Sequence, residues 1–207
     1  MHAEESSNRG VFDQGTRVLH WLTAAFMLSV FVLAFLTDLA TSRTAHIAFL
    51  ELHRLMGLAV WLVTLFRLLW RLNAKYPDWP SDMSETMRAM ARTTEYALYV
   101  LLLLQPILGL LQTNAHGDRA SLFFLGQLPA LIEKNRPLAQ QLLIAHKIVG
   151  FSLLGLIAVH AMAALFHHFV RRDDVLTAML PAAAAWRTPK AACDITASPR
   201  LDSSVTE

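Results

Sequence analysis

Residues 142–170 read LLIAHKIVGFSLLGLIAVHAMAALFHHFV, with Lys147 as the single Lys, Arg, Asp or Glu residue. This run is longer than the roughly 20 apolar residues that cross a hydrocarbon core as an α-helix. His146 and His160 stand fourteen residues apart within it. On a helix this spacing returns the side chain to nearly the same face, about 21 Å further along. We therefore expect one transmembrane helix that presents two imidazoles, at two depths, toward one interior.

Three other apolar stretches have the length of a membrane span. They cover residues 18–36, 48–72 and 96–112. Of all 207 residues 55% are hydrophobic and 16% are charged, a balance that argues against a soluble domain. Backbone groups in lipid must be satisfied internally, and no segment alternates like a barrel strand. The sequence thus predicts an all-α fold, an up-and-down bundle of four transmembrane helices over residues 13–180.

The distribution of Lys and Arg predicts the orientation of this bundle. If both ends of the chain share one side of the membrane, that side holds 12 of the 18 Lys and Arg residues and the other side holds 6. The positive-inside rule then places residues 1–12, the 73–95 loop and residues 181–207 in the cytoplasm. The last segment is rich in Ala, Ser, Thr and Pro, and we expect it to be disordered. A net charge of +2 is too small to indicate a nucleic-acid partner.

The loop at 113–141 lies outside in this orientation and is long for a connection between helices. It mixes aromatic, acidic and basic residues. Both a short amphipathic helix on the membrane surface and a plain connector fit this composition.

Two histidines are level on the outer side of the bilayer. We take Val60 and Leu153 as the midplane positions of the second and fourth spans. His53 and His146 each lie seven residues from these positions, toward the outside. Their imidazoles are therefore expected at the same depth.

A second level pair lies toward the cytoplasm. His160 is seven residues beyond Leu153, and His20 is about eight residues from the centre of the first span near Leu28. An ionisable side chain inside a span is costly and is by default a functional hypothesis. One such histidine could be a packing residue, but four in two level pairs predict cofactor sites.

The chemistry of these pairs indicates b-type haem. The single cysteine, Cys193, lies in the tail, which excludes c-type attachment and thiolate-ligated iron–sulfur clusters. Zinc usually takes four ligands, and no further ligand is placed to complete either pair. Two neutral imidazoles on opposite faces of a planar macrocycle are what a bis-histidine haem b requires. We predict two haems, with the metal ligands His53 and His146 outside and His20 and His160 inside.

Two glycines follow the outer histidines at helical spacing. Gly57 and Gly150 lie four residues after His53 and His146, on the same helix face one turn deeper. A missing side chain there would let a porphyrin ring lie against the backbone. The alternative is that these glycines permit close helix packing in lipid.

Cationic side chains accompany both sites. Arg67 stands fourteen residues after His53, at the inner depth, and Arg71 follows one turn later. Both are candidate partners for haem propionates by bidentate hydrogen bonding. The alternative is that they extend to the cytoplasmic headgroups. Arg54 and Lys147 adjoin the outer histidines and would form a positive rim there.

The remaining histidines are expected not to bind a metal. They are His2, His46, His116, His167 and His168. His167 and His168 fall at headgroup depth beside Arg171 and Arg172. Either could replace His160 only if the fourth helix were displaced by two turns.

The sequence resembles the bacterial cytochrome b561 family. The resembling residues are His20-Trp21, the His53 segment running into Arg67-Leu-Leu-Trp-Arg71, His146 with Gly150, and His160 with the later His167-His168, over roughly residues 13–181. The resemblance implies two b haems with ligands from helices one, two and four. It also implies a multi-pass protein of the bacterial inner membrane that exchanges electrons with quinone, for which ubiquinone is the candidate.

We therefore predict a membrane-integral cytochrome b that transfers single electrons across the inner membrane. The resemblance associates this type with superoxide oxidation coupled to quinone reduction, and the outer cations would suit an anionic donor. A redox protein partner is the other candidate donor. Two alternatives stay open: a haem-b anchor subunit of a dehydrogenase or hydrogenase, and a proton transporter that relays protons through histidines. An absorption spectrum separates the second of these, because a transporter would show no haem bands.

Overall fold

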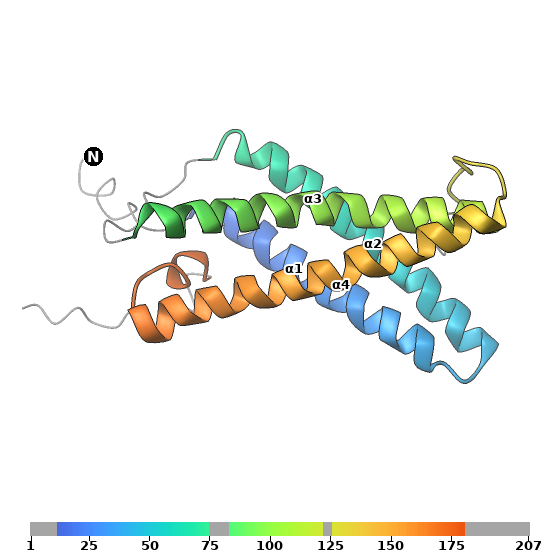
Figure 1. Ribbon diagram of the computed structural model, residues 1–207, viewed down its shortest axis with the longest axis horizontal. Helices are drawn as coiled ribbons and strands as arrows, with labels where there is room; N and C mark the ends of the chain where they lie inside the picture. Colours follow the sequence, from blue (N-terminus) through green and yellow to red (C-terminus); the bar gives the residue numbers. More distant parts are fainter. Residues whose placement is uncertain (1–11, 75–82, 122–125, 181–207) are drawn as a thin grey trace, which may run out of the picture.

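The computed structural model describes residues 12–74, 83–121 and 126–180. Its long helices are α1 (Gln14–Leu39), α2 (Arg43–Arg71), α3 (Glu85–His116) and α4 (Arg136–Phe166) (Figure 1). A π-helical turn, His167–Arg171, continues α4, and a short 3-10 helix, Thr177–Met179, follows it. All four long helices have the length and apolarity needed to cross a membrane. The protein is the all-α, four-helix transmembrane bundle that the sequence predicted.

Each helix begins at a polar side chain that accepts a hydrogen bond from a backbone N–H three residues further on. These capping residues are Asp13, Ser42, Ser84 and Asn135. Such caps satisfy one of the free N–H groups of the first turn. α3 ends at Gly117, whose φ of 101° is a left-handed conformation that glycine adopts without strain. Because caps and not hydropathy set these ends, α3 starts at Glu85, well before its predicted span.

The helices pair as two hairpins, α1 on α2 and α3 on α4. In Figure 1 the α1–α2 hairpin crosses the α3–α4 hairpin at an angle. The backbone of α4 packs closely along α3, whereas it makes few close approaches to α1 or α2. Side chains therefore make most of the contact between α4 and the first hairpin.

One residue from each helix forms the buried core of the bundle. This cluster consists of Met27, Val60, Leu102 and Leu153. Val60 and Leu153 are 2% and 1% exposed, among the most buried large side chains described. They are also the two positions that the sequence placed at the bilayer midplane. The apolar centre of the bundle thus coincides with the predicted midplane.

The start of α1 and the segment after α4 meet at one end of the bundle. Arg17 Nη1 donates to Leu180 O at 3.0 Å, and Trp21 Nε1 donates to Met179 O at 2.8 Å. The first and last described residues are therefore on the same side, as an up-and-down bundle requires. Residues 1–11 and 181–207, the predicted tails, lie outside the described residues.

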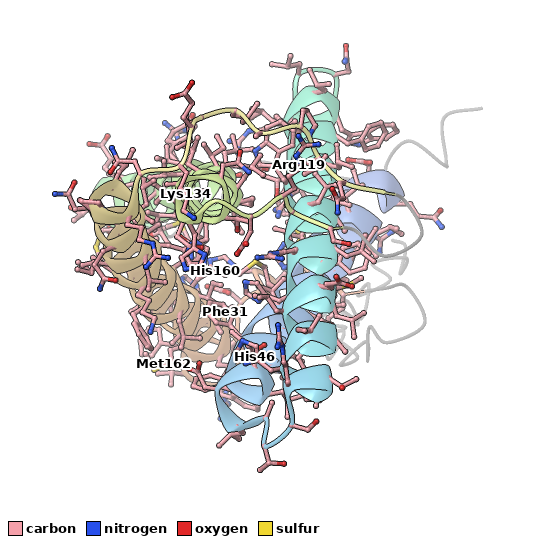
Figure 2. The ribbon with its side chains drawn as sticks, turned by 90° about the vertical axis from the view of Figure 1, so that its right-hand side faces the viewer. Phe31, His46, Arg119, Lys134, His160 and Met162 are labelled. Carbon is pink, nitrogen blue, oxygen red and sulfur yellow. The ribbon has the colours of Figure 1, made fainter. Side chains whose placement is uncertain are left out.

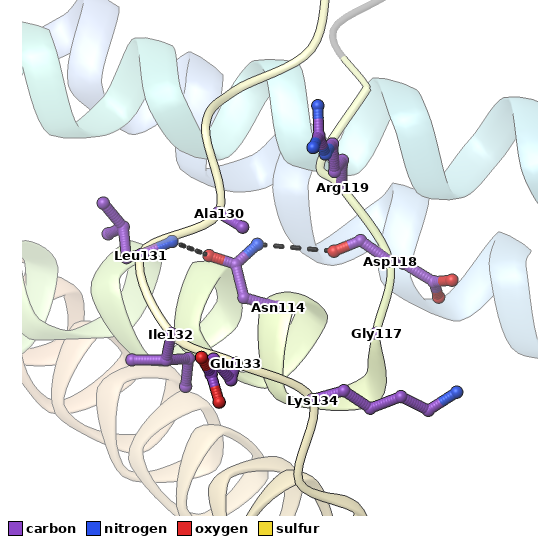
Figure 3. A pocket seen from close by; sticks show the side chains of 9 residues that line it. All are labelled: Asn114, Gly117, Asp118, Arg119, Ala130, Leu131, Ile132, Glu133 and Lys134. Carbon is purple, nitrogen blue, oxygen red and sulfur yellow. Dashed lines mark hydrogen bonds between the residues drawn. The ribbon is translucent and has the colours of Figure 1, made fainter.

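The connection between α3 and α4 is anchored by Asn114. Its side chain accepts from Leu131 N at 2.8 Å and donates to Asp118 O at 3.4 Å (Figure 3). Between the two helices, the described residues 117–121 and 126–135 contain no helix, so the plain connector fits them better than the amphipathic helix. A cavity of about 390 Å³ lies in this loop, and none of the candidate cofactor-binding residues lines it.

Candidate cofactor sites

The structure brings the four predicted histidines together in two pairs. His20 of α1 and His160 of α4 have ring centroids 6.2 Å apart, and His53 of α2 and His146 of α4 have theirs 6.3 Å apart. Figure 2 shows His160 between the ribbons of α4 and α2, with Met162 on the outer side of α4. Each pair therefore links α4 to the opposite hairpin.

These separations fit a metal held between two imidazoles. A metal–imidazole bond of about 2.0–2.1 Å, plus about 1.1 Å from each nitrogen to its ring centre, places two axial imidazole centroids about 6.3 Å apart. Among the described residues, no three or more His, Cys, Asp or Glu side chains gather as a metal site. Two protein ligands per site are sufficient only when the cofactor supplies the remaining ones, as a porphyrin does.

Both outer histidines are oriented by backbone carbonyls. His53 Nδ1 donates to Val30 O at 3.0 Å, and His146 Nδ1 donates to Gln105 O at 3.2 Å. Because Nδ1 then carries the proton, Nε2 is the nitrogen available to a metal. The inner pair differs, since His20 Nδ1 is buried without a hydrogen-bond partner among the described residues.

Helix α3 carries none of the four histidines, yet it contacts the outer site. Gln105 Nε2 donates to His146 O at 2.9 Å, while the Gln105 carbonyl accepts from His146 Nδ1. A Cβ at Gly109 would lie 3.1 Å from His146 Cε1, so the absence of a side chain gives the imidazole its room. Sequence reasoning missed Gln105 and Gly109. A Gln-Pro pair inside an apolar span was the signal that could have found Gln105.

The two predicted glycines have different surroundings. A Cβ at Gly150 would lie 2.9 Å from Gln105 Nε2, so Gly150 admits a side chain from α3. This favours the packing alternative at that position. A Cβ at Gly57 would meet no atom within 4 Å. Gly57 therefore borders open space beside His53, as the cofactor interpretation requires.

The two inner arginines also differ. Arg67 lies close enough to His20 and His160 to interact electrostatically with both, and its guanidinium is 5.4 Å from the centre of the Tyr99 ring. Arg71 forms an ion pair with Glu95 of α3. The Arg71 guanidinium is thus paired with a carboxylate of the protein. Arg67 is therefore the better candidate to bind a haem propionate.

The outer cations are less enclosed. Arg54 Nη2 donates to Thr113 Oγ1 at 3.4 Å and lies near the carboxylates of Glu51 and Asp118. Lys147 is exposed on α4. Arg54 interacts electrostatically with His53, whereas Lys147 adjoins His146 only in sequence.

His167 makes a local contact with the segment after α4. It is buried, and its Nδ1 donates to Asp173 Oδ2 at 2.6 Å, an oxygen that also accepts from Arg171 Nε at 3.2 Å. Burial raises the pKa of Asp173, but the hydrogen bonds from His167 and the Val175 N–H outweigh it, so the pKa lies below its ordinary value of 3.8. His167 thus holds the segment after α4 in place.

Of the other histidines predicted not to bind a metal, the structure describes three. His168 contacts Phe169, His46 Nδ1 donates to Thr37 O, and His116 pairs with Asp118. His2 lies outside the described residues.

Comparison with known proteins identifies the family. The family model for prokaryotic cytochrome b561 matches residues 11–182. The chain belongs to the prokaryotic cytochrome b561 family. Membership in this family, together with four apolar helices, makes it a multi-pass inner-membrane cytochrome that binds haem b.

Three relatives illustrate the range of the family. Cytochrome b561 homolog 2 of Escherichia coli K12 is 30% identical over 162 residues, 78% of this chain and 86% of that protein. Cytochrome b561 homolog 1 of the same organism is 28% identical over 175 residues, 82% of this chain and 97% of that protein. The protein named "Probable superoxide oxidase CybB" of Yersinia pestis is 28% identical over 130 residues, 63% of this chain and 73% of that protein.

Proposed function

We propose that this cytochrome binds two b haems, each between two histidines, and carries single electrons across the inner membrane to the quinone pool. The observation that carries the proposal is the pair of centroid separations, 6.2 Å for His20–His160 and 6.3 Å for His53–His146. Two sites at different depths along one helix give electrons a route across most of the bilayer. When bound, each haem supplies a reversible one-electron carrier.

The protein holds and insulates these sites. The two imidazoles of each pair would both bind the iron of a haem held there, which would leave that iron no open position for oxygen or a substrate. Val60 and Leu153 fill the region between the two depths with apolar side chains and exclude water. Gly57 leaves space beside the outer pair, and Arg67 provides a cation for a propionate at the inner pair. We assign these roles within a cytochrome domain of residues 13–180.

The orientation follows from the charge distribution. The end that carries 12 of the 18 Lys and Arg residues, and both ends of the chain, faces the cytoplasm. The His53–His146 pair then lies toward the periplasm and the His20–His160 pair toward the cytoplasm.

Superoxide is the proposed donor at the outer face. Arg54 and Lys147 place positive charge beside the outer pair, which favours the approach of an anion. The name of the Yersinia pestis relative supports the same chemistry. Two superoxide anions lose one electron each and leave as dioxygen, and ubiquinone takes up these two electrons and two protons to form ubiquinol.

Mixing purified, oxidised protein with superoxide under stopped flow, with and without ubiquinone, tests this function. We expect haem b bands of the reduced form to appear at once and to disappear when ubiquinone is added. A protein with haem bands that superoxide does not reduce, and that co-purifies with a dehydrogenase, would instead be the anchor subunit. Protein without haem bands would favour the histidine-relay transporter.

A further inference from the structure

The two histidine pairs differ in how their Nδ1 atoms are bonded. In the outer pair both Nδ1–H groups donate to backbone carbonyls, at 3.0 Å for His53 and 3.2 Å for His146. In the inner pair His20 Nδ1 is buried without a partner among the described residues. A hydrogen bond from Nδ1 makes the imidazole a more basic ligand, and this is one of the means by which a protein tunes a metal.

The bond at His146 depends on helix α3. Gln105 makes two hydrogen bonds with His146. Its backbone carbonyl accepts from His146 Nδ1, and its side-chain amide donates to the backbone carbonyl of His146 at 2.9 Å. Because Gly150 has no side chain, the Gln105 side-chain amide can lie against the α4 backbone at this position. Gly109 provides the space that the imidazole fills, since a Cβ there would lie 3.1 Å from Cε1 and 3.3 Å from Nδ1.

We propose that Gln105 and Gly109 are positioning residues that hold His146 as an Nδ1 donor and thereby lower the redox potential of the outer site. A more basic axial ligand favours the ferric state. The outer site is thus the lower-potential one, and electrons entering from outside move downhill toward the inner site.

Lys147, which adjoins His146 in sequence, is an exposed cation whose charge opposes this order, whereas the arginines and carboxylates near the two pairs favour it. Each pair has one arginine beside it, Arg54 outside and Arg67 inside. Arg54 lies near the carboxylates of Glu51 and Asp118, which reduce its field at the outer pair. Arg67 acts on both inner histidines, and Glu95, the inner carboxylate near His160, is already paired with Arg71. A net positive field favours the ferrous state at the inner site.

The proposal rests on the proposed function, because it needs His53 and His146 to bind the outer haem. The experiment is a spectroscopic redox titration of the full-length purified protein, resolved into two one-electron components. The component missing from His53→Ala is the outer one. If His53→Ala and His146→Ala lose no haem, the proposed function fails. If they lose one and the variants below behave like the wild type, the positioning proposal alone fails.

Gly109→Ala is the principal variant, because its Cβ presses on the ring and lengthens the bond to the Gln105 carbonyl. We expect both haems to remain bound. At a fixed potential, the ratio of reduced to oxidised outer haem should rise about threefold. This corresponds to a rise of about 28 mV in midpoint potential, at 59 mV per tenfold change for one electron. Gln105→Leu keeps the backbone carbonyl that accepts from His146 Nδ1 but removes the side-chain hydrogen bond that holds the His146 carbonyl, so the imidazole is positioned less firmly. This variant decides the matter if Gly109→Ala loses haem. It should shift the outer component in the same direction and speed haem loss from the outer site.

The matched control is Gly155→Ala on α4, where an added Cβ meets no atom within 4 Å. It should leave both components unchanged. An outer component that lies above the inner one in the wild type, or a shift confined to the inner component in Gly109→Ala and Gln105→Leu, would overturn the proposal. A merely structural role would change haem content or thermal stability without moving one potential selectively.

Discussion

His20 and His160 come from the first and last long helices, and their ring centroids lie 6.2 Å apart. His167, seven residues further along the chain, donates a hydrogen bond from Nδ1 to Asp173. His160 and His167 therefore have separate roles. One faces the other hairpin at the inner site, and the other anchors the segment that folds back after α4.

This division predicts the behaviour of His167→Ala. The variant should keep the haem content of the wild type, because we propose His160, and not His167, as the ligand from this part of the chain. It should lose about 1.5–3 kcal/mol of stability, the usual cost of removing a hydrogen bond to a charged group. Thermal unfolding in detergent, with haem quantified on the same samples, checks both expectations. Loss of one haem in His167→Ala with none lost in His160→Ala would contradict the assignment.

The same contact predicts a pH dependence. The folded-state pKa of Asp173 is below the unfolded value of 3.8, so its stabilising contribution is fully present above 3.8 and is lost as the pH falls through the lower, folded-state value. Asp173→Asn should therefore be less stable than wild type at neutral pH, with the difference shrinking in strong acid. Melting temperatures of both proteins across this range test it. A difference that grows toward low pH would be the wrong sign.

The haem content should depend on the size of the side chain at position 57. A leucine there would fill the open space beside His53, and we expect haem content to fall from two toward one per chain through loss of the outer haem. Gly155→Leu is the control, because its position also borders open space but lies on the face of α4 opposite His146. Equal haem content in the two variants would show that the space at Gly57 is not used by a cofactor.

Arg67 should raise the potential of the inner site. Replacing it with glutamine removes a positive charge near both inner histidines. At an effective dielectric constant of about 20 this charge is worth on the order of 1 kcal/mol, or tens of millivolts for one electron. A redox titration should show the inner component falling while the outer one stays. Arg172→Gln, an exposed arginine at the same end of the bundle, should leave both unchanged.

Much of this arrangement could be predicted because an α-helix rises by a fixed distance per residue, so the position of a residue in a span gives its depth in the membrane. Fourteen residues between His146 and His160 fix two levels on one helix, and the apolar spans fix the midplane at Val60 and Leu153. The structure buries these two residues and joins the four histidines in the predicted pairs. Their role as ligands stays a prediction for experiment.

The contacts made by α3 could not be predicted in the same way. The two hydrogen bonds between Gln105 and His146 depend on how α3 is rotated and shifted against α4. The hydrophobic periodicity of the sequence does not determine that rotation or shift. The same holds for the Arg71–Glu95 ion pair, which joins two helices whose relative rotation is set by packing. The apolar stretches also give helices that are too short, because polar capping residues such as Ser84 lie outside them.

Pyridine haemochrome quantification on the wild type and on alanine variants of His20, His53, His146 and His160 measures how many haems the protein binds and which histidines hold each one. We expect about two haems b per chain in the wild type. His20→Ala and His160→Ala should lose one and the same spectral component, and His53→Ala and His146→Ala the other. A wild-type protein that holds one haem or none, or variants whose losses do not group in these pairs, would contradict this expectation.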